Sequence, residues 1–211
     1  MKTRIIGDIH GMVNDYKAHS IGDFDGTTIQ VGDFGIGFGQ SDYWHESLND
    51  FHANGKHRFI RGNHDNPEVC KTMSGWIKDG TIENDVMFIG GAWSIDWAHR
   101  KEGIDWWREE ELSSSELYQM VEIYAAIKPR IMITHDGPSK ATNEMFISSG
   151  LARMSGGKHI KTRTGEALQA MFDIHQPDEW YFGHWHHTLQ YKLGKTWFQC
   201  IGELDYVDVD L

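Results

Sequence analysis

The stretch RIIGDIHG (residues 4–11) begins as a short β-type run and ends in a polar loop. Two apolar residues lead to Gly7, which permits a tight turn, and Asp8 and His10 follow directly. A polar cluster follows an apolar run in the same way at four further places: GDFG (32–35), GNHD (62–65), THDGP (134–138) and GHWHH (183–187). This repeated order predicts a set of strands whose carboxyl ends carry Asp, Asn and His side chains.

The segments between these runs have helical patterns. One covers about residues 41–53, and another follows Thr164 as far as Pro177. The segment SSSELYQMVEIYAAIKP (113–129) starts with a capping box at Ser113 and Glu116 and should end before Pro129. Strands that alternate with helices predict an α/β fold. We expect one domain over residues 1–211, with loop insertions at about 92–113 and 139–164.

Composition and charge narrow the class of protein. The formal net charge is −11, with 31 acidic against 20 basic residues. Such a chain lacks the basic face that binding duplex DNA by charge requires, so nucleic acid is not an expected partner. The N-terminus has no apolar signal segment and no stretch approaches a membrane span. Together with only two cysteines, Cys70 and Cys200, these features predict a cytoplasmic protein with buried, reduced thiols. The same features are compatible with a virus-encoded protein that acts in its host's cytoplasm.

The polar loops should meet, because ligands of α/β proteins bind at the carboxyl ends of the strands. The side chains they bring are Asp8, His10, Asp33, Asn63, His64, His135, His184 and His186. Mixed carboxylate, amide and imidazole ligands suit manganese, iron or zinc better than calcium. The set is too large for one ion and suits two if one carboxylate bridges them. Two ions about 3.5–4 Å apart can lower the pKa of a bound water toward roughly 7 for attack at phosphorus.

Taken in order, the five motifs resemble the calcineurin-like metallophosphoesterase superfamily, the binuclear metal phosphatases and phosphodiesterases, from Gly7 to His186. The resemblance implies a central β-sandwich of two mixed sheets flanked by helices. It also implies two divalent cations, with Mn²⁺ as first choice and iron, Zn²⁺ or Ni²⁺ as alternatives. Carried over by position, the first ion would be held by Asp8, His10 and His186, the second by Asn63, His135 and His184, and Asp33 would bridge both.

The resemblance also assigns catalysis to His64, which would protonate the leaving group or stabilise the transition-state charge. Asp65 is a candidate to orient His64; otherwise it caps a turn before Pro67. The second motif departs from the family pattern. Ile36 stands where the family often has an Asp and Gly37 where it often has an Arg. In the family's protein phosphatases that Asp orients the catalytic histidine and that Arg grips the phosphate.

The two insertions could supply the missing phosphate grip. The candidate substrate-binding residues are Arg100 in the first insertion and Arg153 and Arg163 in the second. The first insertion is also rich in tryptophan, whose indole faces could bind a base. Two alternatives remain open: the tryptophans attach a cap to the core, and the arginines are solvated. Arg61 is a further candidate unless strand alternation directs it away from the centre.

The expected function is metal-dependent hydrolysis of phosphate esters by a two-metal-activated hydroxide. The departures in the second motif favour a small phosphodiester or nucleotide substrate. A broad phosphomonoesterase or a Ser/Thr-type protein phosphatase is the alternative, and a nuclease comes third. From another class, a non-catalytic protein-binding scaffold could use the same fold. A scaffold has no need of a complete ligand set with His64, whereas this sequence has one.

Overall fold

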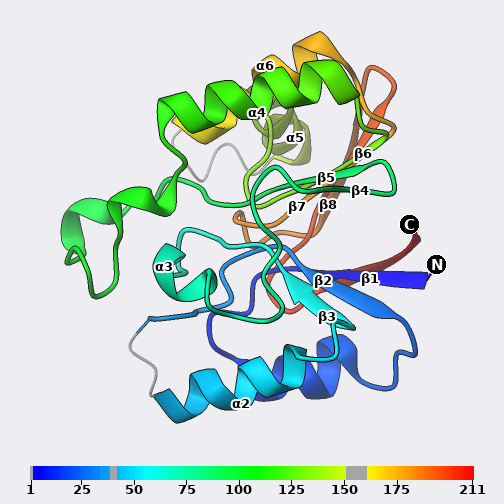
Figure 1. Cartoon of the computed structure of the whole chain (residues 1–211). Helices are drawn as coiled ribbons and strands as arrows, with labels where there is room; N and C mark the ends of the chain where they lie inside the picture. The colour runs from blue at the N-terminus through cyan, green and yellow to red at the C-terminus, as the bar shows by residue number, and fades with distance from the viewer. Residues whose placement is uncertain (1, 39–41, 151–160) are drawn as a thin grey trace.

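The computed structural model describes residues 2–38, 42–150 and 161–211, in which ten strands form two sheets (Figure 1). The four-stranded sheet has the order β10-β1-β2-β3. Its strands are β1 (Lys2–Ile6), β2 (Thr27–Gln30), β3 (His57–Phe59) and β10 (Tyr206–Asp210). The six-stranded sheet has the order β4-β5-β6-β7-β9-β8. Its strands are β4 (Ile82–Glu83), β5 (Val86–Ile89), β6 (Ile131–Thr134), β7 (Glu179–Phe182), β8 (Leu189–Leu193) and β9 (Thr196–Cys200).

The two sheets pack face to face because alternate side chains of their strands point into a shared apolar layer. Ile5 and Ile29 of the smaller sheet are buried in one cluster with Phe88 and Ile133 of the larger sheet. Both sheets are mixed, since parallel central strands carry antiparallel strands at an edge. The predicted sandwich of two mixed sheets flanked by helices is therefore confirmed.

Helices cover the two outer faces, giving four layers (Figure 1). The larger sheet is covered by α4 (Ser114–Ile127), α5 (Ser139–Ser149) and α6 (Arg163–Ile174). The smaller sheet is covered by α2 (Asp42–His52) and the short π-helix η1 (Tyr16–Ile21). Shorter elements are α1 (Val13–Asp15), α3 (Pro67–Cys70), η2 (Trp97–His99) and η3 (Arg108–Glu110). Both cysteines are buried and free, which agrees with the prediction.

The three predicted helices are present, and α5 is the longest of the helices that were not predicted. The capping box at Ser113 and Glu116 is formed in both directions, and α4 ends before Pro129 as expected. The helix α6 begins slightly earlier than predicted because the Thr162 side chain caps it, accepting from Gly165 N–H at 2.9 Å. The helix α5 was not predicted. The insertion expected at 139–164 is therefore helical over its first eleven residues.

The strand directions bring all five polar motifs to one end of the molecule. Strands β1, β2 and β3 run parallel to one another, and so do β5, β6 and β7. The first insertion leaves β5 at that same end. None of the helices in the described part of the chain combines the length and apolar character that crossing a membrane requires.

Candidate metal centre

The candidate centre is assembled from loops of both sheets. Asp8, Asp33 and Asn63 follow β1, β2 and β3 of the smaller sheet. His135 and His184 follow β6 and β7 of the larger sheet. The five strand ends predicted to meet at one edge therefore meet between two sheets, with the side chains in the gap.

Two glycines permit this close approach of the loops. A Cβ atom on Gly183 would lie 2.2 Å from Asp8 Oδ1, and one on Gly32 would lie 2.4 Å from His135 Nδ1. Either contact is far shorter than van der Waals distance. Glycine precedes these motifs because any side chain would push the ligand loops apart.

The backbone is strained at four of the predicted ligands. His10, Asp33, His184 and His186 have φ angles of 43°, 55°, 67° and 54°. This left-handed region costs a non-glycine residue roughly 1–2 kcal/mol, and such residues cluster at functional sites. Here the unusual turns aim carboxylates and imidazoles from separate loops at one point.

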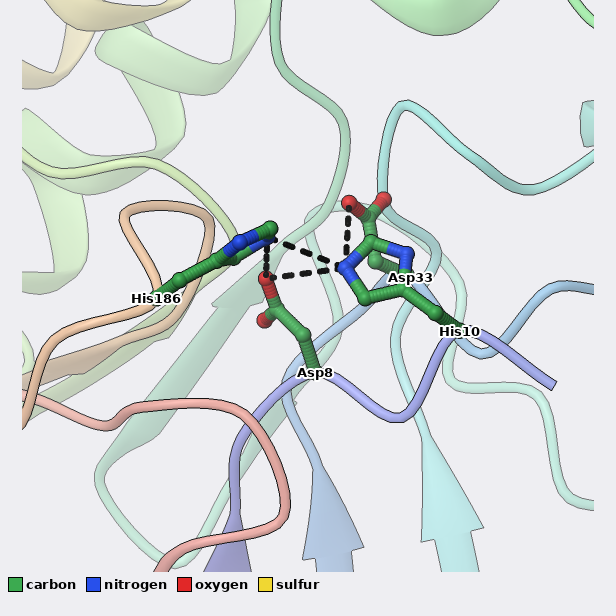
Figure 2. Close-up of side chains that lie close together, drawn as sticks. All are labelled: Asp8, His10, Asp33 and His186. Atoms are coloured by element: carbon green, nitrogen blue, oxygen red, sulfur yellow. Dashed lines mark hydrogen bonds and ion pairs between the residues drawn. The ribbon is translucent and has the colours of Figure 1, made fainter. Parts of the chain in front are cut away.

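Four of these side chains form a first cluster, and Figure 2 shows them pointing toward one another. The Nε2 atoms of His10 and His186 lie 3.0 Å apart. Asp8 Oδ2 lies 3.3 Å from the His186 Nε2 and 3.9 Å from the His10 Nε2. Asp33 Oδ2 lies 3.9 Å from the His10 Nε2. Asp8 and Asp33 are buried, whereas the side chain of His186 is 47% exposed, so this cluster opens to solvent.

A second cluster joins Asp33 to His135 and His184. Asp33 Oδ1 lies 3.3 Å from His135 Nε2, on the other side of its carboxylate from the first cluster. Asn63 Oδ1 lies 3.0 Å from the same nitrogen. His135 is fully buried and Asn63 is 2% exposed. Asp33 is thus the member that both clusters share.

The chemistry of the donor atoms fits divalent cations. Ligand bonds of about 2.0–2.2 Å place two donors on one ion at most about 4.4 Å apart, and the separations above are shorter. His135 Nδ1 lies 2.8 Å from the carbonyl oxygen of Val31, an acceptor, so Nδ1 carries the proton. Its Nε2 is then free to bind a metal, the arrangement that second-shell carbonyls normally enforce.

Buried charges compensate one another inside the centre. Burial acts to lower the pKa of His135, but the carboxylate of Asp33 raises it to about 9. Burial acts to raise the pKa of Asp33, but the charges of His135, His64 and His10 hold it well below its usual range. Burial and the charge of His135 lower the pKa of His184 to about 3, so its imidazole is neutral. A bound cation would take the place of the proton that balances Asp33.

His64 stands at the mouth of this centre. Its backbone N–H donates to Asp33 Oδ1 at 2.7 Å, and its Nδ1 lies 4.0 Å from Asp33 Oδ2. Its ring stacks on Phe38 with centroids 5.4 Å apart. Burial lowers the pKa of His64, and the charge of Arg100 adds to this while Asp33 opposes it. The side chain is 24% exposed, so solvent or a ligand can reach it.

Asp65 does not contact His64 in the structure. Its two carboxylate oxygens accept four backbone N–H groups at 2.7–3.1 Å, from Gly62, Phe34, Gly35 and Ile36. The carboxylate therefore joins the GDFG loop to the GNHD loop. The orienting role predicted for Asp65 gains no support from these contacts.

Of the candidate substrate-binding arginines, Arg100 contacts His64 at the mouth of the centre. Its Nη2 lies 2.6 Å from His64 Nε2. Asp96 binds its Nε at 2.8 Å, and the carbonyl oxygen of Asp105 accepts from Nη1 at 3.1 Å. A guanidinium only donates, so at this distance His64 Nε2 is the acceptor. The first insertion thus carries a fixed positive charge to the mouth of the site.

Two further arginines, Arg163 and Arg61, bind residues outside the centre. Arg163 begins α6 and pairs with Glu111 at 3.3 Å. Arg153 lies outside the described residues. Arg61 is buried, binds Asp79 at 2.9 Å and donates to two backbone carbonyls of the first insertion. It lies beyond the end of β3, its partners are outside the centre, and it attaches the insertion to the sandwich.

Two residues that were not singled out in the sequence support the centre: Ser94 contacts Asn63, and Glu110 contacts Ser94. Asn63 Nδ2 donates to Ser94 Oγ at 3.0 Å, and Ser94 Oγ donates to Glu110 Oε2 at 2.6 Å. Glu110 is one of three consecutive glutamates, residues 109–111. The sequence carries no signal that distinguishes the inward glutamate from its neighbours.

Neither protein-family models nor curated proteins give a match to the sequence. Among solved structures, matches are found. One is from Staphylococcus aureus, a "putative 5'-nucleotidase" in complex with alpha-ketoglutarate. It superposes with a TM-score of 0.55 and 14% identity over 97% of this chain and 49% of its own. Another, from Streptococcus pneumoniae TIGR4, is a conserved uncharacterized protein described as a "predicted phosphoesterase". It has a TM-score of 0.35 and 12% identity over 100% of this chain and 84% of its own.

The likeness to the Staphylococcus aureus protein is one of fold. The chain spans about half the length of that protein, 49%, so the remainder of its structure has no counterpart here. The shared architecture agrees with the resemblance to the metallophosphoesterases that the five motifs carry. Fold and motifs together identify a sandwich whose strand-end loops bring Asp, Asn and His side chains to one point.

Proposed function

We propose that the protein is a metal-dependent phosphoesterase that hydrolyses a small phosphodiester or a nucleotide. The observation that carries this proposal is the position of Asp33, whose two carboxylate oxygens face two separate clusters of potential ligands. Single-ion sites have no use for such a shared carboxylate, whereas two-ion sites are built around one. The fold shared with a nucleotidase-like structure supports the same reaction class.

In this proposal the two clusters hold two divalent cations, with Mn²⁺ as first choice. The open cluster of Asp8, His10 and His186 would hold one, and the buried cluster of Asn63, His135 and His184 the other. Asp33 would contact both. When bound, the cations supply Lewis-acid chemistry: they lower the pKa of a water and offset the charge of a phosphoryl group.

The chain's own residues would bind and orient the ester. Arg100 is held from behind by Asp96 and the Asp105 carbonyl, which leaves Nη2 directed at His64. A phosphate that reaches His64 therefore meets a guanidinium whose orientation is already fixed, and preorganised charge of this kind binds phosphate well. Arg100 would thus take the phosphate-binding role of the Arg that the family often has at the position of Gly37. His64 would stand beside the leaving-group oxygen. Its Nε2 accepts from Arg100 in the structure, so it could carry a proton to that oxygen only after the phosphate has taken over the Arg100 bond.

Trp97 supports the preference for a nucleotide or an aromatic diester. It lies in the short helix η2, three residues before Arg100, and is 46% exposed. Trp106 contacts its indole at 5.8 Å between ring centroids, which holds it in place. An exposed, supported indole next to a phosphate-binding arginine offers a face for a base.

A paired assay tests the function. Metal-stripped protein would be resupplied with Mn²⁺ and given bis-p-nitrophenyl phosphate or p-nitrophenyl phosphate, with His64→Ala as the control. The proposal predicts hydrolysis of both esters that depends on Mn²⁺, faster turnover of the diester, and a large loss in the His64→Ala variant. Faster turnover of the monoester would favour a phosphomonoesterase. No turnover, together with no metal in the purified protein, would contradict the proposal and favour the scaffold.

A further inference from the structure

We infer that Glu110 and Ser94 act together as a positioning pair that turns the Asn63 amide so that its oxygen, and not its nitrogen, faces the buried cluster. This inference rests on the proposed function and deepens it, because it names residues outside the ligand set that set the affinity of one cation position. Both residues come from the first insertion, which the metal-ligand motifs do not include.

The contacts form an unbroken chain in the interior. Glu110 Oε1 accepts from the backbone N–H of Ser94 at 2.9 Å, and Glu110 Oε2 accepts from its hydroxyl at 2.6 Å. Ser94 Oγ accepts from Asn63 Nδ2 at 3.0 Å, and Asn63 Oδ1 lies 3.0 Å from His135 Nε2. Glu110, Ser94 and Asn63 are each only 2% exposed, so water does not compete for these bonds.

The direction of the Asn63 amide follows from counting protons. A serine hydroxyl has one proton, and the Ser94 proton goes to the carboxylate of Glu110. Ser94 Oγ can then only accept from Asn63, which requires the NH₂ group on that side. The amide oxygen is therefore left facing His135. A flipped Asn63 would present N–H groups, which cannot bind a cation.

The position of Glu110 is fixed from the opposite side. Arg61 Nη1 donates to the carbonyl oxygens of Glu109 and Glu110, each at 2.9 Å. Arg61 is itself held by Asp79 at 2.9 Å, and Asp79 accepts from the Gly90 N–H at 2.6 Å. The backbone of the insertion cannot shift at Glu110 without breaking these hydrogen bonds to the buried Arg61. Supporting residues of this kind typically change metal affinity by 10–100-fold.

The neighbouring Glu111 provides a matched control. It is also buried, at 5% exposed, but it faces the start of α6. Its Oε1 accepts from the backbone N–H of Thr164 at 2.9 Å and from its hydroxyl at 3.1 Å, and its Oε2 pairs with Arg163. Two adjacent buried glutamates thus have different partners, and only Glu110 connects to Asn63.

The test is the affinity of the metal-free protein for Mn²⁺, measured by isothermal titration calorimetry. The wild-type protein should bind two ions. In Ser94→Ala and in Glu110→Gln one ion should bind about 10–100-fold more weakly while the other is unchanged, since a glutamine cannot accept both bonds from Ser94. Glu111→Gln should bind both ions as the wild type does.

A double-mutant cycle separates positioning from general destabilisation. Asn63→Asp replaces the amide by a carboxylate, either oxygen of which can bind a cation, so orientation no longer matters. Ser94→Ala should therefore weaken Mn²⁺ binding in the wild-type background and have little effect in the Asn63→Asp background. Equal losses in both backgrounds would overturn the inference, and so would an unchanged affinity in both Ser94→Ala and Glu110→Gln. A wild-type protein that binds fewer than two ions would overturn the proposed two-ion site as well, which distinguishes the two failures.

Discussion

The two halves of the candidate centre share Asp33 but are built differently. In the open half, His186 is 47% and His10 is 21% exposed, and both project from left-handed turns at the rim. In the buried half, His135 is fully buried with its Nδ1 bound by a carbonyl, and Asn63 is held by Ser94. The side chains of the buried half are thus preorganised by the surrounding core, whereas those of the open half are held by fewer contacts.

If the centre binds two cations as proposed, this difference implies unequal affinities for them. Preorganised ligands lose little conformational freedom on binding, whereas exposed side chains must be immobilised. The buried position should therefore bind its ion more tightly and release it more slowly. The open position, beside His64 and Arg100, should exchange its ion more readily.

The largest expected effect comes from breaking both halves at once. Asp33→Asn removes the shared charge while keeping an oxygen that can accept from the His64 N–H. Turnover of the diester should fall by on the order of 10³-fold or more, and both ions should be lost. Circular dichroism should show an unchanged fold. Normal activity in this variant would remove the basis for a shared carboxylate.

The two halves should differ in how much a single substitution lowers the unfolding free energy. In the metal-free protein, His135→Ala leaves the buried charge of Asp33 without its main partner, and this should cost about 3 kcal/mol of unfolding free energy. His186→Ala removes a half-exposed ring, and the buried Asp8 keeps the backbone N–H of His184 as a partner, so the loss should be smaller, about 1 kcal/mol or less. Urea denaturation of both variants measures the difference. Equal losses would contradict the contrast between a buried and an open half.

Acid pH should destabilise the folded protein through His52, which belongs to neither half of the centre. His52 is fully buried among Phe34, Phe51 and Phe59, and neither of its ring nitrogens has a hydrogen-bond partner among the described residues. Burial, with smaller contributions from the charges of His57 and Lys17, lowers its pKa to about 3.

Because the unfolded chain protonates His52 near pH 6.5 and the folded chain does not, its contribution to stability is present above pH 6.5. It is lost as the pH falls toward 3. At pH 5 this amounts to about 2 kcal/mol. His52→Phe should remove that loss, which would appear as a smaller drop in the urea midpoint between pH 7 and pH 5. The same drop in wild type and variant would assign the acid sensitivity to other groups.

The smallest expected effect concerns the mouth of the open half. Arg100→Gln should raise the KM for the diester by at least about tenfold, since a charged hydrogen bond to phosphate contributes about 1.5–3 kcal/mol. Arg108→Gln is the control, because Arg108 lies in the same insertion but is 74% exposed and pairs with Glu102. If both variants have the same KM as the wild type, Arg100 does not bind the phosphate.

The sequence predicted which residues gather at the centre better than it predicted the residues and helices that hold them in place. Asp8, Asp33 and His135 each follow a strand directly, so the alternation of apolar run and polar loop was enough to bring them together. The helix α5 was missed because its Ser, Thr and Asn residues have low helix propensity, and packing of Ala141 and Met145 on the core stabilises it instead.

The supporting contacts depend on geometry that spacing cannot reveal. Asp65 is adjacent to His64 in sequence, yet its carboxylate turns to backbone amides of another loop. Glu110 and Glu111 are adjacent as well, and the local turn at η3 decides which of them reaches Ser94. Such choices are made by tertiary packing and not by local sequence.

The central claim is that Asp33 lies between two cations, and anomalous diffraction from crystals soaked in Mn²⁺ tests it most directly. We expect two anomalous peaks about 3.5–4 Å apart, both in contact with Asp33. One should be bound by Asp8, His10 and His186 and the other by Asn63, His135 and His184, with the second peak the stronger at limiting Mn²⁺. A single peak, or two peaks of which only one contacts Asp33, would contradict the claim.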